Sequence, residues 1–385
     1  MATKFFTQHK EEFKFGWEVE LMVTDSNFTP LFGKTLPFEK VMRIISSLDL
    51  PVIDYLEAKY VGSGQNCCYA EGFETKVSND LVKSVDVKGI EIRTPISFSI
   101  PDSVNQFEQC YLKVHKGFQL HELEITCFGN HPFQPHYSGP RLKRSIVDWA
   151  SAEVAMTTHG LAINISLPER LEKKLNREKL ECRFSYAAPI MVLFSADTPF
   201  RMGQPWKYGN NICFSERSYR RSFTRNTFYL RNHENYRKEI TLFDMTNELN
   251  RYLAYASLSL GIILSNRDFP VIPEHFSREN VRRVAVNGYG ATLVDRNFAT
   301  LYPSQVAREL LSACCESLQE YNFDSCYLDI LWDDLDKELI PAQSTLEKFE
   351  KSNSIQEILR QRSNLIKGKL DRGHIKDFSS EISSS

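Results

Sequence analysis

The stretch Gly16-Trp17-Glu18-Val19-Glu20-Leu21 places two glutamates two residues apart inside an otherwise apolar run. In an extended chain, residues i and i+2 share a face, so the carboxylates of Glu18 and Glu20 project to the same side, about 7 Å apart. Like charges in this position repel each other and are costly to desolvate unless a cation neutralises them. Oxygen ligands of this kind suit a hard ion such as Mg²⁺, whereas the alternative is the solvated face of an amphipathic strand.

Two further acidic segments favour the metal interpretation. Residues 89–95 read Gly-Ile-Glu-Ile-Arg-Thr-Pro and contain Glu91, and residues 239–244 read Glu-Ile-Thr-Leu-Phe-Asp and begin with Glu239. If three strands present these glutamates, together with Glu18 and Glu20, to one concave sheet face, they form a carboxylate cluster. Such a cluster could hold two or three Mg²⁺ ions, which in turn would hold the phosphates of a nucleotide.

The composition excludes several classes of protein. The chain has 385 residues, of which 42% are hydrophobic and 25% charged, which is ordinary for a globular protein with a large core. A net charge of −2 predicts no binding to nucleic acid or to an anionic membrane surface. The N-terminus lacks an apolar signal segment, and the longest apolar run, 253–264, is shorter than the roughly 20 residues that a span needs. Nine cysteines without a Cys-x-x-Cys pair indicate reduced thiols and a cytoplasmic location.

The order of the strand and helix patterns favours an α+β fold over a doubly wound α/β fold, because acidic strands need a solvated or metal-filled face. Strands are predicted at 14–23, 85–93, 125–128, 161–167 and 240–243. Helices are predicted at 38–48, 103–117, 187–195, 247–264, 305–321, 326–339 and 344–369. Residues 62–68 are predicted to form a loop, and 201–237 a long functional loop with short strands. We expect a single catalytic domain over 1–370, with a helical part at about 300–370, and a disordered tail over 371–385.

Six short motifs, in order along residues 14–365, carry a resemblance to a known family. They are Gly-x-Glu-x-Glu at 16–20, Glu-Ile-Arg-Thr-Pro at 91–95, Gly-Asn-His-Pro-Phe at 129–133, Ser-Ala-Asp-Thr-Pro-Phe at 195–200 with Gly203, a run from Glu279 to Asp295, and Arg-Gln-Arg at 360–362. Taken together, they make the chain similar to the glutamate–cysteine ligase family, in its carboxylate–amine ligase branch. The resemblance implies a glutamine synthetase-like fold, in which an antiparallel sheet forms a concave active-site face surrounded by helices.

The resemblance also implies a reaction. ATP and Mg²⁺ would convert a small carboxylate, often the γ-carboxylate of glutamate, into an acyl phosphate, and an amine, often that of an amino acid, would displace phosphate to form an amide. Glu18, Glu20, Glu91 and Glu239 would bind metal, with Glu239 also in a catalytic position. Arg217 and Arg220 would contact the phosphate or the substrate as catalytic groups, together with Asn164. The alternative for the two arginines is a solvated basic loop.

Two positions depart from the family pattern. Thr241 stands where the family carries an arginine, and Ala162 where many relatives carry a histidine. Threonine cannot supply positive charge to a transferred phosphoryl group. A catalytically impaired, nucleotide-binding relative that acts as a scaffold therefore remains the alternative function, and a phosphotransferase is a third. The sequence predicts small-molecule partners and leaves a homo-oligomer open.

Overall fold

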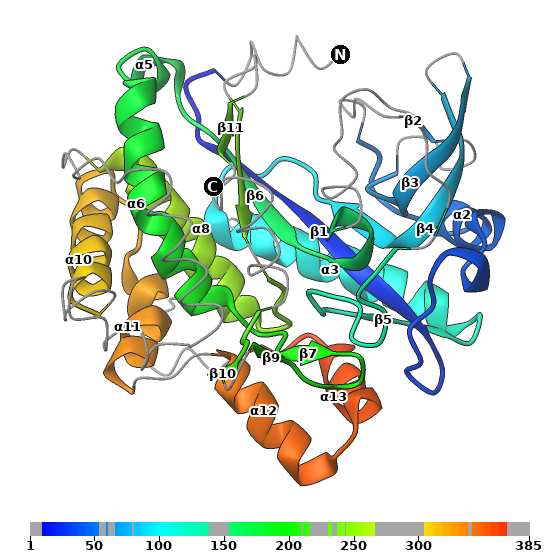
Figure 1. Ribbon diagram of the computed structural model, residues 1–385. Helices are drawn as coiled ribbons and strands as arrows, with labels where there is room; N and C mark the ends of the chain where they lie inside the picture. Colours follow the sequence, from blue (N-terminus) through cyan, green and yellow to red (C-terminus); the bar gives the residue numbers. More distant parts are fainter. Residues whose placement is uncertain are drawn as a thin grey trace, which may run out of the picture.

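The computed structural model describes residues 10–53, 59–60, 66–78, 81–137, 139, 154–208, 211–215, 230–232, 237–242, 244–265, 304–337 and 341–367. Figure 1 shows these residues as a central sheet with helices beside it. The predicted tail at 371–385 and both predicted phosphate contacts, Arg217 and Arg220, lie outside the described residues.

The centre of the fold is an eight-stranded sheet in the order β11-β12-β6-β1-β4-β2, with β3 paired to β4 and β5 paired to β1. Its strands are β1 (Lys14–Asp25), β2 (Lys59–Tyr60), β3 (Cys68–Ser78), β4 (Leu81–Arg93), β5 (Leu123–Thr126), β6 (Leu161–Ser166), β11 (Leu230–Asn232) and β12 (Arg237–Leu242). All neighbouring strands are antiparallel except β2 and β4. Two small sheets are formed by β7 (Phe200–Arg201) with β8 (Gln204–Pro205) and by β9 (Lys207–Tyr208) with β10 (Asn211–Ile212).

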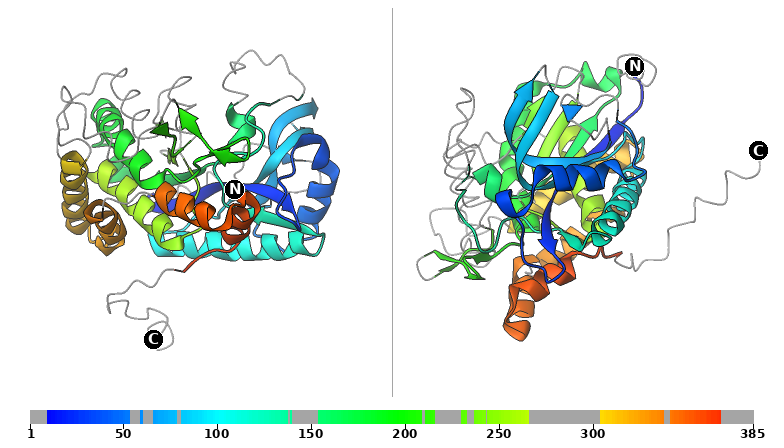
Figure 2. Two further views of the ribbon diagram at one scale, coloured as in Figure 1. Left: turned by 60° about the horizontal axis from the view of Figure 1, so that its bottom comes forward. Right: turned by 90° about the vertical axis from the view of Figure 1, so that its right-hand side faces the viewer.

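Helices cover one face of the sheet. The described helices are η1 (Gly33–Thr35), α2 (Phe38–Ser46), α3 (Ile100–Gln119), α5 (Glu169–Glu172), α6 (Arg177–Ser195), α8 (Leu249–Leu264), α10 (Ser304–Glu320), η2 (Cys326–Leu328), α11 (Asp329–Asp336), α12 (Pro341–Ser352) and α13 (Ile355–Arg362). Of these, α3 and α8 contact each other and the central strands, and Figure 2 shows the sheet curling away from them. The opposite, concave face is therefore free of these two helices.

Strand β1 has one apolar and one polar face, as its sequence predicts. Trp17 and Leu21 are fully buried on the helical side, where the Trp17 indole N–H donates to Ser103 Oγ of α3 over 3.1 Å. The Trp17 ring also meets Tyr252 of α8 edge to face, with the ring centroids 5.0 Å apart. Because side chains alternate along a strand, burial of these residues turns Glu18 and Glu20 to the concave side.

Three of the predicted elements are wrong in detail. The sequence analysis predicted no strand between residues 24 and 84, whereas β3 (Cys68–Ser78) and the start of β4 (Leu81–Arg93) form a long antiparallel pair there. The single helix predicted at 344–369 is two helices, because Asn353 has a φ of +48° and Ser354 caps α13 by accepting a hydrogen bond from the N–H of Glu357. The helix predicted at 326–339 begins as the 3₁₀ turn η2. The predicted α+β class with an antiparallel, curled sheet surrounded by helices is confirmed.

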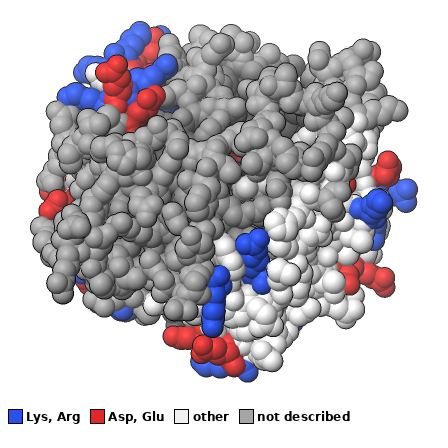
Figure 3. All heavy atoms as spheres, viewed as in Figure 1, with Lys and Arg blue, Asp and Glu red and all other residues white. Residues whose placement is uncertain are grey.

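Charged surface groups of both signs are mixed. On the face shown in Figure 3, described acidic and basic side chains lie beside one another without an extended area of one sign. Among the described residues, no helix is both long enough and apolar enough to cross a membrane.

Candidate functional site

Acidic side chains from neighbouring strands meet on the concave face. The register of β1 with β4 places Glu20 opposite Glu91, and Glu18 opposite Arg93. On the far side of β4, Tyr69 of β3 lies opposite Glu91. The three glutamates that the sequence places on the two acidic strands are thus brought together by the pairing of β1 with β4.

A further carboxylate, Glu71 of β3, completes the group and was missed by the sequence analysis. Carboxylate oxygens of Glu20, Glu71 and Glu91 all lie within 4.8 Å of one another, a spacing that could hold a metal ion. Three oxygen donors of this kind are the ligands that Mg²⁺ prefers. Glu71 sits in the stretch Tyr69-Ala70-Glu71-Gly72-Phe73, so its alternation with apolar neighbours was the signal that could have revealed it.

Burial makes this group electrostatically unfavourable without a cation. Burial raises the pKa of Glu71 well above its ordinary value, and repulsion from Glu91 adds to the increase. Burial also raises the pKa of Glu91, although the Arg93 guanidinium opposes that change. A divalent ion would relieve both effects, because it stabilises the ionised carboxylates. The donor set therefore fits a hard divalent cation.

Basic side chains also reach the carboxylates. Lys88 Nζ lies 2.8 Å from Glu20 Oε1 and 3.8 Å from Glu71 Oε1. Arg93 Nε lies 2.9 Å from Glu91 Oε1, and its Nη2 lies 3.7 Å from Glu18 Oε2. These ion pairs neutralise part of the negative charge of the carboxylates on the concave face.

Glu18 is held from the other side by β6 and β12. Asn164 Nδ2 donates to Glu18 Oε1 over 3.1 Å, and Arg237 Nη1 lies 3.3 Å from the same oxygen. The buried Asn164 Oδ1 has no hydrogen-bond partner among the described residues, so it remains an acceptor for a bound group. Arg237 was missed, because it lies in an arginine-rich stretch without a clear period.

The two departures from the family pattern lie next to Glu18. Ala162 is opposite Glu18 on β1 and opposite Thr241 on β12, so the three residues form one row across the sheet. Arg237 precedes Thr241 by four residues and therefore lies on the same face of β12. Glu239 lies between them on that face, opposite Asn164 and one row from Glu18. It is outside the group formed by Glu20, Glu71 and Glu91.

A buried histidine, His159, lies next to Lys88 and to the residue that binds Glu20. His159 Nε2 is 3.2 Å from the backbone oxygen of Lys88, and its neighbour Gly160 donates its N–H to Glu20 Oε2 over 2.8 Å. Burial and the nearby Lys88 ammonium lower the pKa of His159 to about 3. The imidazole is therefore neutral at physiological pH and cannot replace a cationic side chain.

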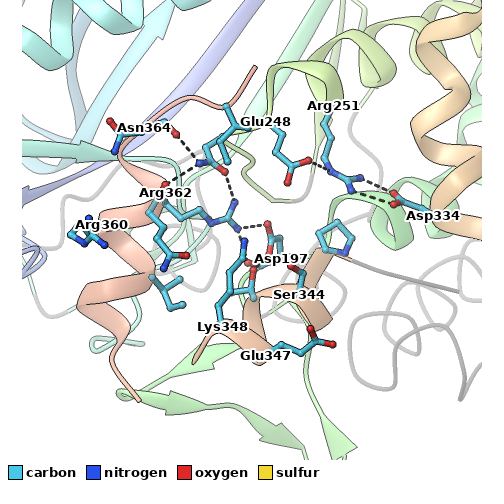
Figure 4. Close-up of a pocket in the computed structure, with 16 residues that line it drawn as sticks. Asp197, Glu248, Arg251, Asp334, Ser344, Glu347, Lys348, Arg360, Arg362 and Asn364 are labelled. Atoms are coloured by element: carbon cyan, nitrogen blue, oxygen red, sulfur yellow. Dashed lines mark hydrogen bonds and ion pairs between the residues drawn. The ribbon is translucent and has the colours of Figure 1, made fainter. Parts of the chain in front are cut away.

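Two of the other family-like motifs line a separate cavity, whereas the run from Glu279 to Asp295 lies outside the described residues. Asp197, from the motif at 195–200, and Arg362, from the motif at 360–362, form a buried ion pair. They line a cavity of about 600 Å³ together with residues of α8, α11, α12 and α13. Figure 4 shows its labelled charged side chains, including the Arg251–Asp334 pair on the opposite wall. None of the concave-face glutamates lines this cavity.

Comparison with solved structures shows what this fold is similar to. A bifunctional glutathione synthetase from Pasteurella multocida superposes with a TM-score of 0.63 and 12% identity, over 94% of this chain and 53% of that chain. A glutamate–cysteine ligase from Francisella tularensis in complex with AMP gives a TM-score of 0.58 and 10% identity, over 92% of this chain and 89% of that chain. The ligase PafA, in its complex with the prokaryotic ubiquitin-like protein Pup, superposes with a TM-score of 0.55 and 11% identity, over 95% of this chain and 78% of that chain.

These similarities define the class of fold. The chain has the fold shared by these carboxylate–amine ligases, so the resemblance to the glutamate–cysteine ligase family is confirmed at the level of the fold. It spans about half the length of the bifunctional glutathione synthetase. Searches against protein-family profiles and against curated protein sequences found no match.

Proposed function

We propose that this protein is an ATP- and Mg²⁺-dependent ligase that joins a carboxylate to an amine through an acyl phosphate. The observation that carries the proposal is the group of Glu20, Glu71 and Glu91 on the concave face of a sheet with a ligase fold. Glu91 is buried and Glu20 and Glu71 are partly buried, so their mutual repulsion is unfavourable for stability, and a role in binding a cation explains their position.

Different residues of the concave face would bind the metal ion, the nucleotide and the substrate. Glu20, Glu71 and Glu91 would hold a divalent ion, with Glu18 and Glu239 as further carboxylates beside it. The ion would neutralise the charge of the ATP phosphates and of the transferred group. Arg237 and Arg93 hold Glu18 in place and carry positive charge to the rim of the face. Asn164 would bind nucleotide or substrate through its open Oδ1, and Arg217 and Arg220 stay proposed contacts for the phosphate.

The substrates we propose are a small carboxylate, with the γ-carboxylate of glutamate as the first to test, and the amine of an amino acid. Two of the similar structures are named for glutathione synthesis or glutamate–cysteine ligation, and one of these contains AMP. A cytoplasmic location would keep thiols such as the buried Cys67 and Cys110 reduced.

A second function, a nucleotide-binding relative without turnover, is favoured by one observation. The row of Thr241, Ala162 and Glu18 lacks the arginine and histidine of the family pattern, while Glu18 is already engaged by Arg93 and Arg237. Loss of one charged contact to a transition state can lower a rate by about 10²–10³-fold. Such a protein would still bind ATP and Mg²⁺.

Trapping of the acyl phosphate tests the proposal. Purified protein is incubated with Mg²⁺, ATP and a panel of amino-acid carboxylates, with hydroxylamine as a general amine. We expect ADP and a hydroxamate to form in equal amounts, only when a carboxylate is present. ADP with a stable phosphorylated product would indicate a phosphotransferase, and nucleotide binding without ADP would favour the second function. Absence of both binding and turnover would contradict the proposal.

A further inference from the structure

We propose that Lys88 is a fixed cation of the candidate site, whose ammonium group takes the position of one metal ion. The inference rests on the proposed function, because it assumes that the remaining carboxylates bind a divalent ion. It adds that this chain needs one ion fewer than its carboxylates alone would require.

The backbone brings Lys88 to the concave face by an irregularity of the sheet. Along the β3–β4 pair, Glu71 lies opposite Gly89 and Gly72 lies opposite Val87, so Lys88 is an extra residue without a partner on β3. A bulge of this kind re-aims a side chain that strict alternation would send to the other face. Gly72 and Gly89 permit the close approach, since an added Cβ at either would lie 2.1 Å or 2.2 Å from a backbone oxygen.

The surroundings of the Lys88 ammonium resemble the shell of a hard cation. Nζ lies 2.8 Å from Glu20 Oε1 and 3.8 Å from Glu71 Oε1. It also donates to the backbone oxygens of Ala155 and Thr158, over 3.0 Å and 3.1 Å. All four neighbours are oxygen atoms, and the side chain is 3% exposed. Mixed carboxylate and carbonyl oxygens are the donors that hard cations use in proteins.

Glu20 has little capacity left for a second ion at this end of the group. Its Oε1 faces Lys88, and its Oε2 accepts the N–H of Gly160 over 2.8 Å. An ion bound between Glu71 and Glu91 would therefore share only the outer lone pairs of Glu20.

The balance of formal charges on the described face also supports the replacement of one metal ion by Lys88. The face carries five carboxylates and three basic side chains, namely Glu18, Glu20, Glu71, Glu91 and Glu239 with Lys88, Arg93 and Arg237. The formal excess of two negative charges equals the charge of one divalent ion. Without Lys88 the excess would rise, and an additional cation would be needed to hold the same carboxylates together.

Counting of bound Mn²⁺ tests the inference without any assay of activity. Mn²⁺ is titrated into the nucleotide-free protein, and the free ion is followed by electron paramagnetic resonance. We expect Lys88→Met to bind about one ion more per chain than the wild type. The melting temperature of Lys88→Met should rise with Mn²⁺ by more than that of the wild type.

Lys238→Met is the matched control. Lys238 is also fully buried and paired with a glutamate, Glu172, but it lies on β12 and points to the opposite face of the same sheet. This variant should lose stability that Mn²⁺ does not restore, and its ion count should equal that of the wild type. Lys88→Arg, which keeps the charge, should also keep the wild-type count.

Each outcome decides a separate point. If wild type and Lys88→Met bind the same number of ions, the role of Lys88 is wrong and the proposed function stands. If neither binds Mn²⁺, the metal site of the proposed function fails as well. A Lys88→Met chain that stays unfolded in saturating Mn²⁺ would also overturn the inference, because the ion then does not replace the ammonium.

Discussion

Arg362 of α13 is ion-paired with Asp197, which follows Ala196, the C-cap of α6, and both side chains are less than 10% exposed. Arg362 Nη2 also donates to the backbone oxygen of Asp197 over 3.1 Å, and its guanidinium lies 5.9 Å from the ring centroid of Phe128. Thr345 of α12 donates to the same carboxylate through its hydroxyl group. The pair thus links the segment after α6 to α12 and α13, and Figure 4 shows Asp197 and Arg362 pointing toward each other.

We expect Arg362→Ala to lower the free energy of unfolding by about 3–5 kcal/mol, because it leaves the buried Asp197 carboxylate without its counter-ion. Urea denaturation followed by circular dichroism measures this loss. Arg360→Ala is the control, since Arg360 is exposed and pairs with Glu357 at the surface. Its effect should be much smaller. Equal losses in the two variants would contradict a structural role for the buried pair.

Gly129, the first residue of the motif at 129–133, packs against Asp244, which also accepts a hydrogen bond from Thr198 of the motif at 195–200. Thr198 Oγ1 donates to Asp244 Oδ2 over 2.6 Å, and the N–H of Met245 donates to Oδ1 over 2.9 Å. A Cβ added at Gly129 would lie 1.8 Å from Asp244 Oδ1, which explains the glycine at the start of the motif at 129–133. We expect Gly129→Ala to be destabilised by about 1–3 kcal/mol, since the close packing leaves no space for a methyl group. Thermal unfolding measures this change, and a wild-type melting temperature would contradict it.

Asp244 also predicts a pH dependence of stability. Burial raises its pKa to about 6 from the usual 3.8, although hydrogen bonds from Thr198 and from the backbone partly oppose the increase. The folded state therefore binds the proton more tightly than the unfolded state. The resulting stabilisation is complete below about pH 4 and is lost as the pH rises through about 6.

The size of this contribution is about 3 kcal/mol, from a shift of about two pKa units. We expect the difference in unfolding free energy between wild type and Asp244→Asn to change by this amount between about pH 4 and pH 7. The difference between the two proteins is measured because the pH dependence that they share, from all other titratable groups, cancels in it. A difference that does not depend on pH would show that Asp244 is not perturbed.

The sequence predicts the parts of this fold that follow from strict alternation. Glu18 and Glu20 on β1, and Glu91 on β4, were located because apolar residues of the opposite face separate them from their neighbours. Glu71 was missed because the strand β3 was not predicted, and Lys88 was missed because only a shift in register beside Gly72 brings it to the same face. Such a shift depends on the partner strand, which periodicity along one segment does not describe.

The contact between Arg237 and Glu18 also could not be predicted from the sequence. Its side chain reaches Glu18, more than two hundred residues earlier, only because β6 lies between β12 and β1. The order of strands in a sheet is set by tertiary packing, whereas the sequence pattern shows only that each strand exists. The resemblance to the ligase family indicates a missing positive charge at Thr241, which is four residues from Arg237 on the same face of β12.

Arg237 is therefore the residue that we expect to provide the positive charge missing at Thr241. Arg237→Gln should reduce the single-turnover rate of ADP formation by about 10²–10³-fold, with a smaller effect on ATP binding. Arg308→Gln is the control, because Arg308 lies on α10 and pairs with Asp336. Thr241→Arg should leave the rate of the wild type nearly unchanged. A large gain from Thr241→Arg would instead indicate an enzyme impaired by the loss of that arginine.

Metal affinity should distinguish the carboxylates of the concave face. Glu71→Gln should weaken Mn²⁺ binding by about 10-fold or more, because Glu71 belongs to the group with Glu20 and Glu91. Glu239→Gln should have a smaller effect, because Glu239 lies outside that group, two strands away from Glu20. Isothermal titration calorimetry of the nucleotide-free protein measures both affinities. If Glu239→Gln has the larger effect, the ion is bound beside Glu18 and β12, and the group on β1, β3 and β4 is held together by Lys88 and Arg93 alone.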